Sequence, residues 1–203
     1  MNFKTTQENF WAGQFGDEYI KRNDSESLQF SKVALWSQML RSANSVNSAL
    51  ELGCNIGLNL VALSKLSPKM KLIGYEINSK AVQRAREYQV ASIHEGSILD
   101  KINTEMCDLT FTAGVLIHIN PKYLDNVYEN LVTNSGRYVL VAEYYSPDPT
   151  VITYRGEQDK LFKRDFAGDL IDRYGMKLVD YGFLYKRDNW APQDDITWFL
   201  LEK

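Results

Sequence analysis

Short apolar runs alternate along most of this chain with segments whose apolar residues recur at helical spacing. Short apolar runs bounded by turn residues are typical of buried strands, whereas apolar positions three and four residues apart indicate amphipathic helices. Strands that alternate with helices predict a parallel sheet with right-handed crossovers. The predicted strands cover residues 48–52, 71–75, 92–95, 107–112 and 137–143, and the predicted helices between them cover 57–66, 79–88 and 121–131.

The end of the chain departs from this alternation. A helix is predicted over 164–174, and apolar runs at 177–185 and 196–201 follow it with only a polar loop between them. Two consecutive strands without a crossover must pair antiparallel. The sequence therefore predicts an α/β, doubly wound, Rossmann-like fold whose mostly parallel seven-stranded sheet ends in an antiparallel hairpin.

Helical spacing with many aromatic residues also marks the stretch before the first strand, from about residue 7 to residue 42. We expect residues 1–47 to form an N-terminal helical cap on a catalytic core of residues 48–203. The length of 203 residues suits a single domain. One insertion, at about residues 144–165, separates the fifth strand from the next helix.

The turn after the first predicted strand carries the most informative chemistry. Glycine lets a backbone turn tightly and lets a ligand approach main-chain N–H groups. The next strand ends on Glu76, and an acid at that place suits the paired hydroxyls of a ribose. These features predict a nucleoside-bearing cofactor across the carboxyl ends of the sheet. The turn reads Glu51-Leu-Gly53-Cys-Asn55-Ile-Gly57-Leu-Asn59.

The same turn discriminates between two cofactors. A dinucleotide-binding turn has the pattern G-x-G-x-x-G, in which the middle glycine clears space for a pyrophosphate. Here Asn55 stands between Gly53 and Gly57, and the third glycine is missing. Glu51 adds a negative charge that disfavours a pyrophosphate and suits an ammonium or sulfonium group. The pattern favours S-adenosylmethionine, and an NAD-dependent oxidoreductase is the alternative.

The turn, the Tyr75-Glu-Ile-Asn78 strand end and the Gly114–Ile119 segment resemble class I S-adenosylmethionine-dependent methyltransferases. More narrowly, the chain resembles the family of pseudaminic acid biosynthesis-associated methylases. That resemblance implies methyl transfer to a small, anionic acceptor, such as a nonulosonic-acid-type sugar or its activated derivative. The segments that carry the narrower resemblance are 10–19, 154–156, 160–168 and 194–202.

The cofactor shell expected from the motif and the resemblance lies at the ends of the first four strands. Glu76 would bind the ribose, Ile77 would pack on the adenine, and Ser97 and Ile98 would hold the adenine edge. The remaining expected residues are Glu51, Gly53, Asn55, Gly57 and Asn59 near the amino-acid end, and Thr112, Ala113 and Gly114 near the methionine and methyl groups.

Methyl transfer from a sulfonium is an in-line displacement that needs alignment in a dry site and no protein nucleophile. An acceptor hydroxyl also needs a base. His118, four residues beyond the predicted fourth strand, is one candidate, because a neutral imidazole can accept a proton. Glu143 and Asp165 are competing candidates, and a packing role for His118 is the alternative. Methylation of oxygen or of nitrogen stays open.

Acceptor recognition is expected outside the cofactor motifs. In the resemblance, the insertion after the fifth strand builds an acceptor lid, and an arginine there can bind an anion through two parallel hydrogen bonds. A solvated charged face is the alternative for the same cluster. The candidates are Tyr144, Tyr145, Tyr154, Arg155, Lys160, Lys163 and Arg164 from the insertion, and Trp11, Tyr19, Arg22 and Asn23 from the cap.

The composition and charge of the chain limit the classes of partner that the sequence favours. The net charge of -3 disfavours nucleic acid held by a general phosphate-binding surface. The sequence contains no apolar stretch long enough for a membrane span, and its polar start is unlike a signal peptide, so a cytoplasmic protein is expected. Two cysteines and two histidines at scattered spacings predict neither a disulfide framework nor a metal site. A non-catalytic S-adenosylmethionine-binding partner protein is a further alternative, and the oligomeric state is not predicted.

Overall fold

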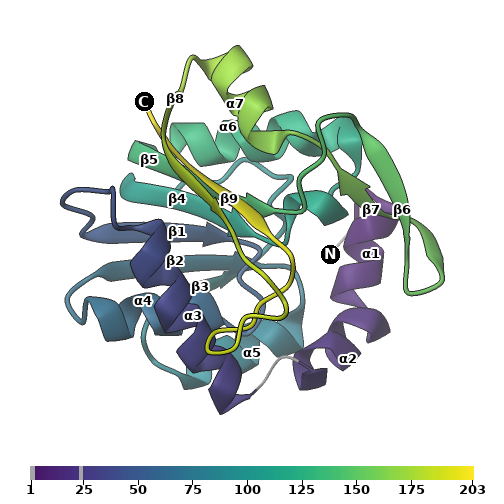
Figure 1. The fold of residues 1–203 in the computed structure, drawn as a ribbon. Coiled ribbons are helices and arrows are strands. Elements are labelled where there is room, and N and C mark those ends of the chain that lie inside the picture. Colours follow the sequence, from purple (N-terminus) through teal and green to yellow (C-terminus); the bar gives the residue numbers. More distant parts are fainter. Residues whose placement is uncertain (1–2, 23–24) are drawn as a thin grey trace.

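The computed structural model describes residues 3–22 and 25–203, and within them seven strands form one sheet in the order β3-β2-β1-β4-β5-β9-β8 (Figure 1). The first five of these strands are parallel, and β9 runs antiparallel to both of its neighbours. The predicted mostly parallel sheet with an antiparallel strand pair is confirmed. The strands are β1 (Ser48–Leu52), β2 (Lys71–Glu76), β3 (Ser92–Glu95), β4 (Cys107–Ala113), β5 (Ser135–Glu143), β8 (Lys177–Phe183) and β9 (Thr197–Glu202).

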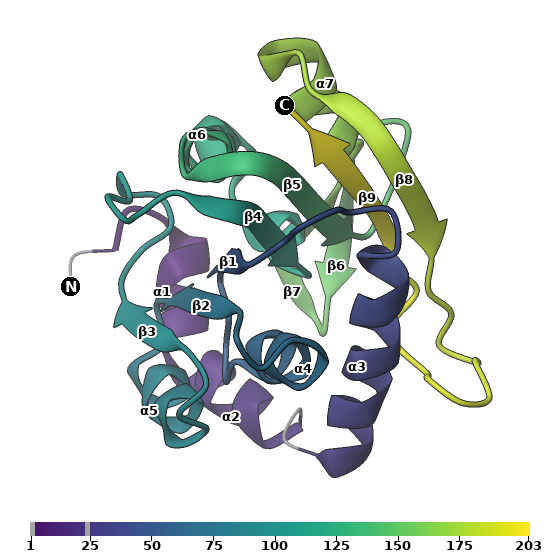
Figure 2. The same ribbon diagram turned by 90° about the vertical axis from the view of Figure 1, so that its left-hand side faces the viewer.

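Helices cover both faces of this sheet, as the side view in Figure 2 shows. One apolar core joins α3, α4 and α5 to one face, with Trp36 and Trp198 among its fully buried side chains. A second core joins α6 and α7 to the other face. The helices are α3 (Glu26–Met39), α4 (Leu58–Leu66), α5 (Ser79–Glu87), α6 (Leu124–Thr133) and α7 (Phe166–Tyr174), with single 3-10 turns η1 (Leu116–His118) and η2 (Pro121–Tyr123).

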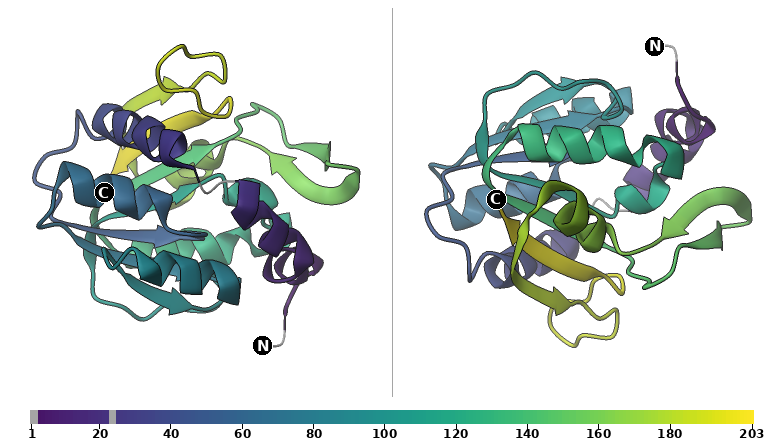
Figure 3. Two further views of the ribbon diagram at one scale, coloured as in Figure 1. Left: turned by 90° about the horizontal axis from the view of Figure 1, so that it is seen from below. Right: turned by 90° about the horizontal axis from the view of Figure 1, so that it is seen from above.

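The N-terminal cap contains a break that the helical spacing did not predict. Helix α1 (Thr6–Ala12) ends at Gly13, and α2 (Gln14–Arg22) starts immediately afterwards. A Cβ on Gly16 would stand 1.9 Å from the carbonyl oxygen of Trp11, so only glycine allows the two helices to approach this closely. Both helices lie beyond the carboxyl ends of the central strands (Figure 3).

The insertion after β5 forms a β-hairpin of β6 (Thr150–Tyr154) and β7 (Glu157–Lys163) that projects on the same side as α1 (Figure 3). Arg155 and Gly156 form its two-residue turn, both with positive φ, as tight hairpins require. The helix predicted from residue 164 starts at Phe166 instead. Asp165 is its N-cap and accepts a hydrogen bond from the Gly168 N–H at 2.7 Å.

None of the helices in the described part of the chain is long and apolar enough to cross a membrane.

Candidate functional site

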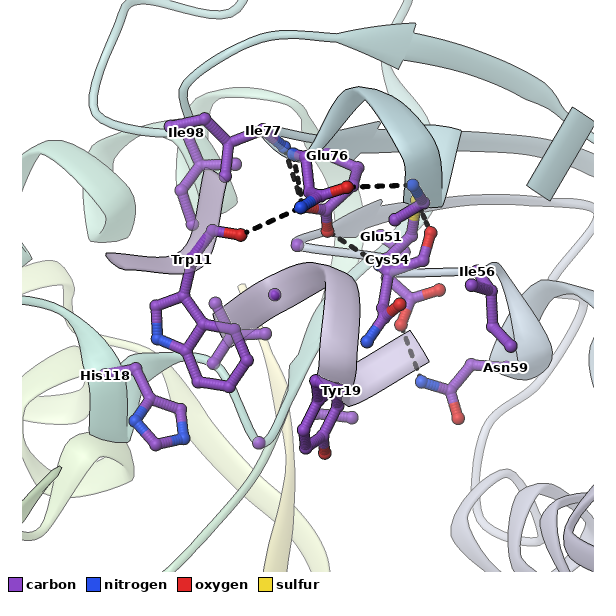
Figure 4. Close-up of a pocket in the computed structure, with 18 of the residues that line it drawn as sticks. Trp11, Tyr19, Glu51, Cys54, Ile56, Asn59, Glu76, Ile77, Ile98 and His118 are labelled. Atoms are coloured by element: carbon purple, nitrogen blue, oxygen red, sulfur yellow. Dashed lines mark hydrogen bonds between the residues drawn. The ribbon is translucent and has the colours of Figure 1, made fainter. Parts of the chain in front are cut away.

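A cavity of about 480 Å³ lies at the carboxyl ends of the parallel strands (Figure 4). In open α/β sheets this is the edge at which ligands bind, where the strand order reverses. Its floor is the turn after β1 together with the ends of β2, β3 and β4. Helices α1, α2 and α3 and the loop between β8 and β9 supply its walls. Segments from both ends of the chain therefore enclose a site that the central strands position.

The turn after β1 keeps its shape through main-chain contacts. The N–H groups of Gly53 and Cys54 both donate to the Tyr75 carbonyl oxygen, at 2.8 and 2.9 Å. Gly53 and Asn55 adopt positive φ, at 78° and 48°, so the backbone bends sharply over the end of β2. Glycine and asparagine are the residues that adopt this conformation most readily. The turn and the end of β2 therefore form one unit.

Glu51 is only 1% exposed, although its carboxylate lines the cavity. Its Oε1 accepts a hydrogen bond from Asn59 Nδ2 at 2.6 Å, while its Oε2 has no partner among the described residues. Burial raises the pKa of Glu51 to about 8, against the opposing effects of Asn59 and Lys32, so a positive charge on a bound ligand would favour its ionised form at neutral pH. A buried oxygen without a donor in a cavity wall is an acceptor available to a ligand.

Glu76 is buried at the end of β2 and faces the same turn (Figure 4). It accepts three main-chain hydrogen bonds, from Asn55 at 2.7 Å, Ile77 at 2.9 Å and Asn78 at 2.8 Å. Burial raises the pKa of Glu76, and the three N–H groups oppose that shift. These donors hold the carboxylate in one orientation at the cavity wall.

The Asn78 side chain links this region to the cap. Its Oδ1 caps α5 by accepting from the Lys80 and Ala81 N–H groups, both at 3.0 Å. Its Nδ2 donates to the Trp11 carbonyl at 3.1 Å and to Asp17 at 3.0 Å. The end of β2 therefore fixes the position of α1 and α2 over the cavity.

At the β3 side of the cavity, Ile77 and Ile98 supply apolar walls. The Ser97 hydroxyl donates to the carboxylate of Glu8, a residue of α1 that is itself held in a capping box with Thr5. Glu8 lines the cavity and was not among the residues expected there. It brings a carboxylate next to Ser97 from the far end of the sequence.

His118 lines the cavity between two aromatic rings. Its ring centroid lies 4.6 Å from that of Trp11 and 4.9 Å from that of Tyr154. Nδ1 lies 2.6 Å from the Lys160 carbonyl oxygen, which can only accept, so the proton is on Nδ1 and Nε2 is the basic nitrogen. Burial lowers the pKa of His118 to about 4. The imidazole is therefore neutral at physiological pH.

The cavity brings together most of the residues expected to bind the cofactor, with two exceptions. Gly57 is the N-cap residue of α4, with φ of 78°, and lies outside the lining. Thr112 is fully buried within β4 and also lies outside it. The expected residues that line the cavity are Trp11, Tyr19, Glu51, Gly53, Asn55, Asn59, Glu76, Ile77, Ser97, Ile98, Ala113, Gly114 and His118.

Glu143 does not occupy the position expected of a base. It is buried beneath the loop after β4. There its carboxylate accepts hydrogen bonds from the N–H groups of Val115 and Leu116, both at 3.1 Å, and of Ile117 at 3.4 Å. It does not line the cavity. The structure corrects its role to an anchor for the loop that carries His118. Burial raises the pKa of this carboxyl to about 7.

Several residues expected to bind the acceptor have other contacts. Arg164 pairs with Asp169 at 2.9 Å, so its charge is already neutralised. The Lys163 ammonium lies 5.3 Å from the centre of the Tyr144 ring. Tyr145 packs against Phe199 and, like Lys163 and Arg164, lies outside the cavity lining. Asp165 caps α7, and Asn23 lies outside the described residues.

Five expected residues and Asp194, which was not expected, gather at the edge of the cavity in what we call the mouth cluster: Tyr19, Arg22, Tyr144, Tyr154, Arg155 and Asp194. Tyr144 bonds to Asp194, and burial, with that carboxylate, raises the pKa of Tyr144. Burial raises the pKa of Tyr19 to about 12, with smaller effects from Tyr154, Asp194 and the two arginines. The arginines lie over aromatic rings, Arg22 at 5.6 Å from Tyr19 and Arg155 at 5.8 Å from Tyr154.

The sequence interpretation missed two contributions to the site. Lys32 of α3 lines the cavity, and the β8–β9 loop contributes Lys186, Gln193 and Asp194. Lys32 could have been recognised from the sequence, because it lies on the helical stripe of Leu28, Leu35 and Trp36, where an apolar residue is expected. The loop could not, since polar residues between two strands are ordinary. Among the described residues, no group of three His, Cys, Asp or Glu side chains is arranged to hold a metal.

Comparison with known proteins identifies the fold. No family model matches the chain. The ribosomal RNA small subunit methyltransferase C of Serratia proteamaculans (strain 568) is 28% identical over 116 residues, which cover 51% of this chain and 33% of that protein. The chain therefore matches only about a third of the length of this curated relative.

Solved structures match over nearly the whole chain. Magnesium protoporphyrin IX methyltransferase from Synechocystis PCC 6803, with bound S-adenosylhomocysteine, has a TM-score of 0.72 at 11% identity and covers 97% of both chains. The N-methyltransferase NodS from Bradyrhizobium japonicum WM9 has a TM-score of 0.66 at 17% identity, covering 89% of this chain and 98% of that one. The chain thus has the class I methyltransferase fold, while the narrower family resemblance stays a prediction.

The buried carboxyls generate a prediction for stability. Glu143 has a pKa of about 7 in the folded protein and an ordinary value of 4.5, so the folded state binds more protons between these values. Its contribution to the free energy of unfolding therefore falls as pH rises from about 4.5 to 7, by at most ~1.4 kcal/mol per pH unit. The Glu143→Gln variant should lose that slope in urea unfolding at pH 5, 6 and 7.

The pH slope of the free energy of unfolding must be compared between wild type and Glu143→Gln, because His118 changes that slope in the opposite direction. Its pKa of about 4 lies below its ordinary value of 6.5, so it adds stability as pH rises through that interval. Equal pH slopes in wild type and Glu143→Gln would contradict the assignment.

Proposed function

We propose that this protein is an S-adenosylmethionine-dependent methyltransferase that acts on a small, anionic acceptor. The observation that carries the proposal is the pair of buried carboxylates, Glu51 and Glu76, on either side of the Gly53–Asn55 turn in one cavity. The fold shared with methyltransferase structures, one of which contains S-adenosylhomocysteine, supports it.

The donor groups of the cavity match the parts of this cofactor. Glu51 Oε2, buried and unpartnered within the described residues, suits a positively charged amino group. Glu76 suits a ribose hydroxyl, since its Oε2 accepts only from Asn55 and retains acceptor capacity, whereas Oε1 already accepts from Ile77 and Asn78. Ile77 and Ile98 suit an adenine ring. Once bound, the cofactor would supply an activated methyl group.

The NAD alternative receives less support. Asn55 occupies the place of the glycine that clears room for a pyrophosphate, and its positive φ turns its side chain into the cavity lining. Its Oδ1 is buried without a partner in the described structure, as is Glu51 Oε2. Two unpartnered acceptors in this wall favour a ligand with donors over a pyrophosphate, which has only acceptors.

The mouth cluster supports an anionic, hydroxyl-rich acceptor. Arg22 and Arg155 supply positive charge, and three tyrosines and Asp194 supply hydrogen-bonding groups to hydroxyls. A sugar acid has both features, and a nonulosonic-acid-type sugar or its activated derivative is the specific acceptor that the sequence resemblance favours. The aromatic and charged cluster also favours an enzyme over a non-catalytic cofactor-binding partner. The relative that acts on ribosomal RNA leaves RNA as the competing acceptor.

His118 is proposed to orient the acceptor. Its neutral Nε2 can accept a hydrogen bond from a hydroxyl or an amine in the cavity. A group with a pKa near 4 is a weak proton acceptor at neutral pH, because a general base works best when its pKa lies near the working pH. A nitrogen acceptor that arrives deprotonated needs no base at all.

The cofactor assignment predicts the effect of Glu76→Ala. Losing charge-assisted hydrogen bonds of about 1–3 kcal/mol should raise the Kd for S-adenosylhomocysteine by roughly 5- to 150-fold in calorimetry. Glu95→Ala, at the exposed end of β3, is the matched control and should bind normally. NAD should not bind to wild type. Binding of NAD without S-adenosylhomocysteine would reject the proposal, and unaltered affinity in Glu76→Ala would exclude this residue from the site.

The acceptor assignment predicts the effect of Arg155→Lys. With saturating S-adenosylhomocysteine, N-acetylneuraminate serves as the probe anion, and its Kd should rise about tenfold, because lysine keeps the charge and loses the planar fork. The affinity for S-adenosylhomocysteine should not change, since Arg155 lies at the hairpin tip outside the cavity lining. Equal loss of both affinities would assign Arg155 a structural role.

The orienting role of His118 predicts the effect of His118→Ala on methyl transfer. The rate constant kcat should fall by less than about tenfold, and the pH–rate profile from pH 6 to 9 should keep its shape. A positioned general base would instead be worth roughly 10²–10⁴-fold. A loss of that size, together with disappearance of an acid limb, would establish His118 as the base.

A further inference from the structure

The ammonium group of Lys32 lies in the cavity wall with a neutral partner. Lys32 extends from α3, and its Nζ donates to Asn59 Oδ1 at 2.9 Å. No carboxylate of residues 3–22 or 25–203 forms an ion pair with it, although Glu51 and Asp194 act on it through space. Burial lowers the pKa of Lys32. A desolvated ammonium that lacks a counter-ion lowers the stability of the fold. Its position in the cavity wall therefore indicates that a ligand supplies the counter-ion.

The hydrogen bonds around Asn59 fix which charge lies on which side. Its Oδ1 accepts from Lys32 Nζ and also from Trp36 Nε1 at 3.3 Å, and its Nδ2 donates to Glu51 Oε1 at 2.6 Å. Lysine and tryptophan can only donate, so the amide oxygen must face them and the amide cannot be turned over. Asn59 therefore holds a cation and an anion apart on the same wall of the cavity.

Glu51 and Lys32 differ from an ordinary ion pair, because each can still form hydrogen bonds with a ligand in the cavity. Glu51 Oε2 has no partner within the described part of the chain, and neither has the nearby Asn55 Oδ1. Lys32 Nζ has three protons, of which one is used in the hydrogen bond to Asn59. A ligand that carries an ammonium and a carboxylate on one carbon would satisfy both sides at once. Such a group is the α-amino acid end of S-adenosylmethionine.

We propose that Lys32 is a specificity-determining residue that binds the carboxylate of the cofactor's amino-acid end, while Glu51 binds its ammonium. This inference rests on the proposed function and assigns to α3, a helix of the cap, a direct part in cofactor recognition. Lys32 and Glu51, held apart by Asn59, bind the zwitterion. Glu76 and the apolar walls bind the nucleoside. A cofactor fragment without the amino acid would bind without any contact to Lys32.

The experiment compares two ligands and two lysine variants of the full chain. S-Adenosylhomocysteine contains the zwitterion, and 5′-methylthioadenosine contains the same nucleoside and thioether without it. Lys32→Met removes the charge and keeps the length of the side chain, and Lys69→Met, on an exposed turn, is the matched control. Calorimetry without any acceptor measures the affinities for both ligands in wild type and in each variant.

We expect Lys32→Met to raise the Kd for S-adenosylhomocysteine by roughly 10- to 100-fold, the value of a charge-assisted contact, and to change that for 5′-methylthioadenosine less than twofold. Lys69→Met should match wild type. The melting temperature of Lys32→Met without ligand should be equal or higher, because a desolvated ammonium is removed. A residue that served only to hold the cavity together would lower the melting temperature and weaken both ligands.

Equal weakening of the two ligands, or unchanged binding of S-adenosylhomocysteine, would overturn the assignment of Lys32. Failure of the proposed function gives a different result, in which wild type binds neither ligand. As a second variant, Glu51→Gln should also weaken S-adenosylhomocysteine selectively. Its effect and that of Lys32→Met should not be additive, because both residues bind one zwitterion.

Discussion

Burying a carboxylate costs several kcal/mol unless donors surround it, and this protein buries Glu51 and Glu76 at the ends of neighbouring strands. The local chain supplies those donors, because the turn after β1 and the start of α5 direct N–H groups at Glu76 and Asn59 donates to Glu51. One oxygen of Glu51 is left without a donor in the described structure. That oxygen is the structural reason for proposing that the cavity binds a positively charged group.

The rest of the fold holds the segments around this arrangement in place. Asn78 ties the cap to the end of β2, Glu8 reaches Ser97 from α1, and Glu143 anchors the loop that carries His118. Each tie links segments far apart in the chain through a side chain that bonds main-chain or hydroxyl groups. The burial of Glu51 and Glu76 strengthens their electrostatic contacts, which would suit the proposed methyl transfer, a reaction that depends on alignment.

Under the proposed function, recognition of the acceptor would be divided among distant segments, whereas the turn proposed to bind the cofactor is local. The mouth cluster combines α2, the end of β5, the β6–β7 hairpin and the β8–β9 loop. Such a composite surface varies easily without disturbing the strand ends, because loops tolerate substitution better than the elements they connect.

The sequence by itself determined the sheet, because apolar runs and glycine-marked turns are local signals, and β1 and β3 have the predicted bounds. It also located Glu51, Asn55 and Glu76, since strand ends converge at one edge of a parallel sheet. Only the tertiary structure decided the rest. Lys32 enters the site through helix packing, Glu143 turns under a loop instead of into the cavity, and Glu8 meets Ser97 across 89 residues. Those outcomes depend on contacts between distant segments, for which local spacing carries no information.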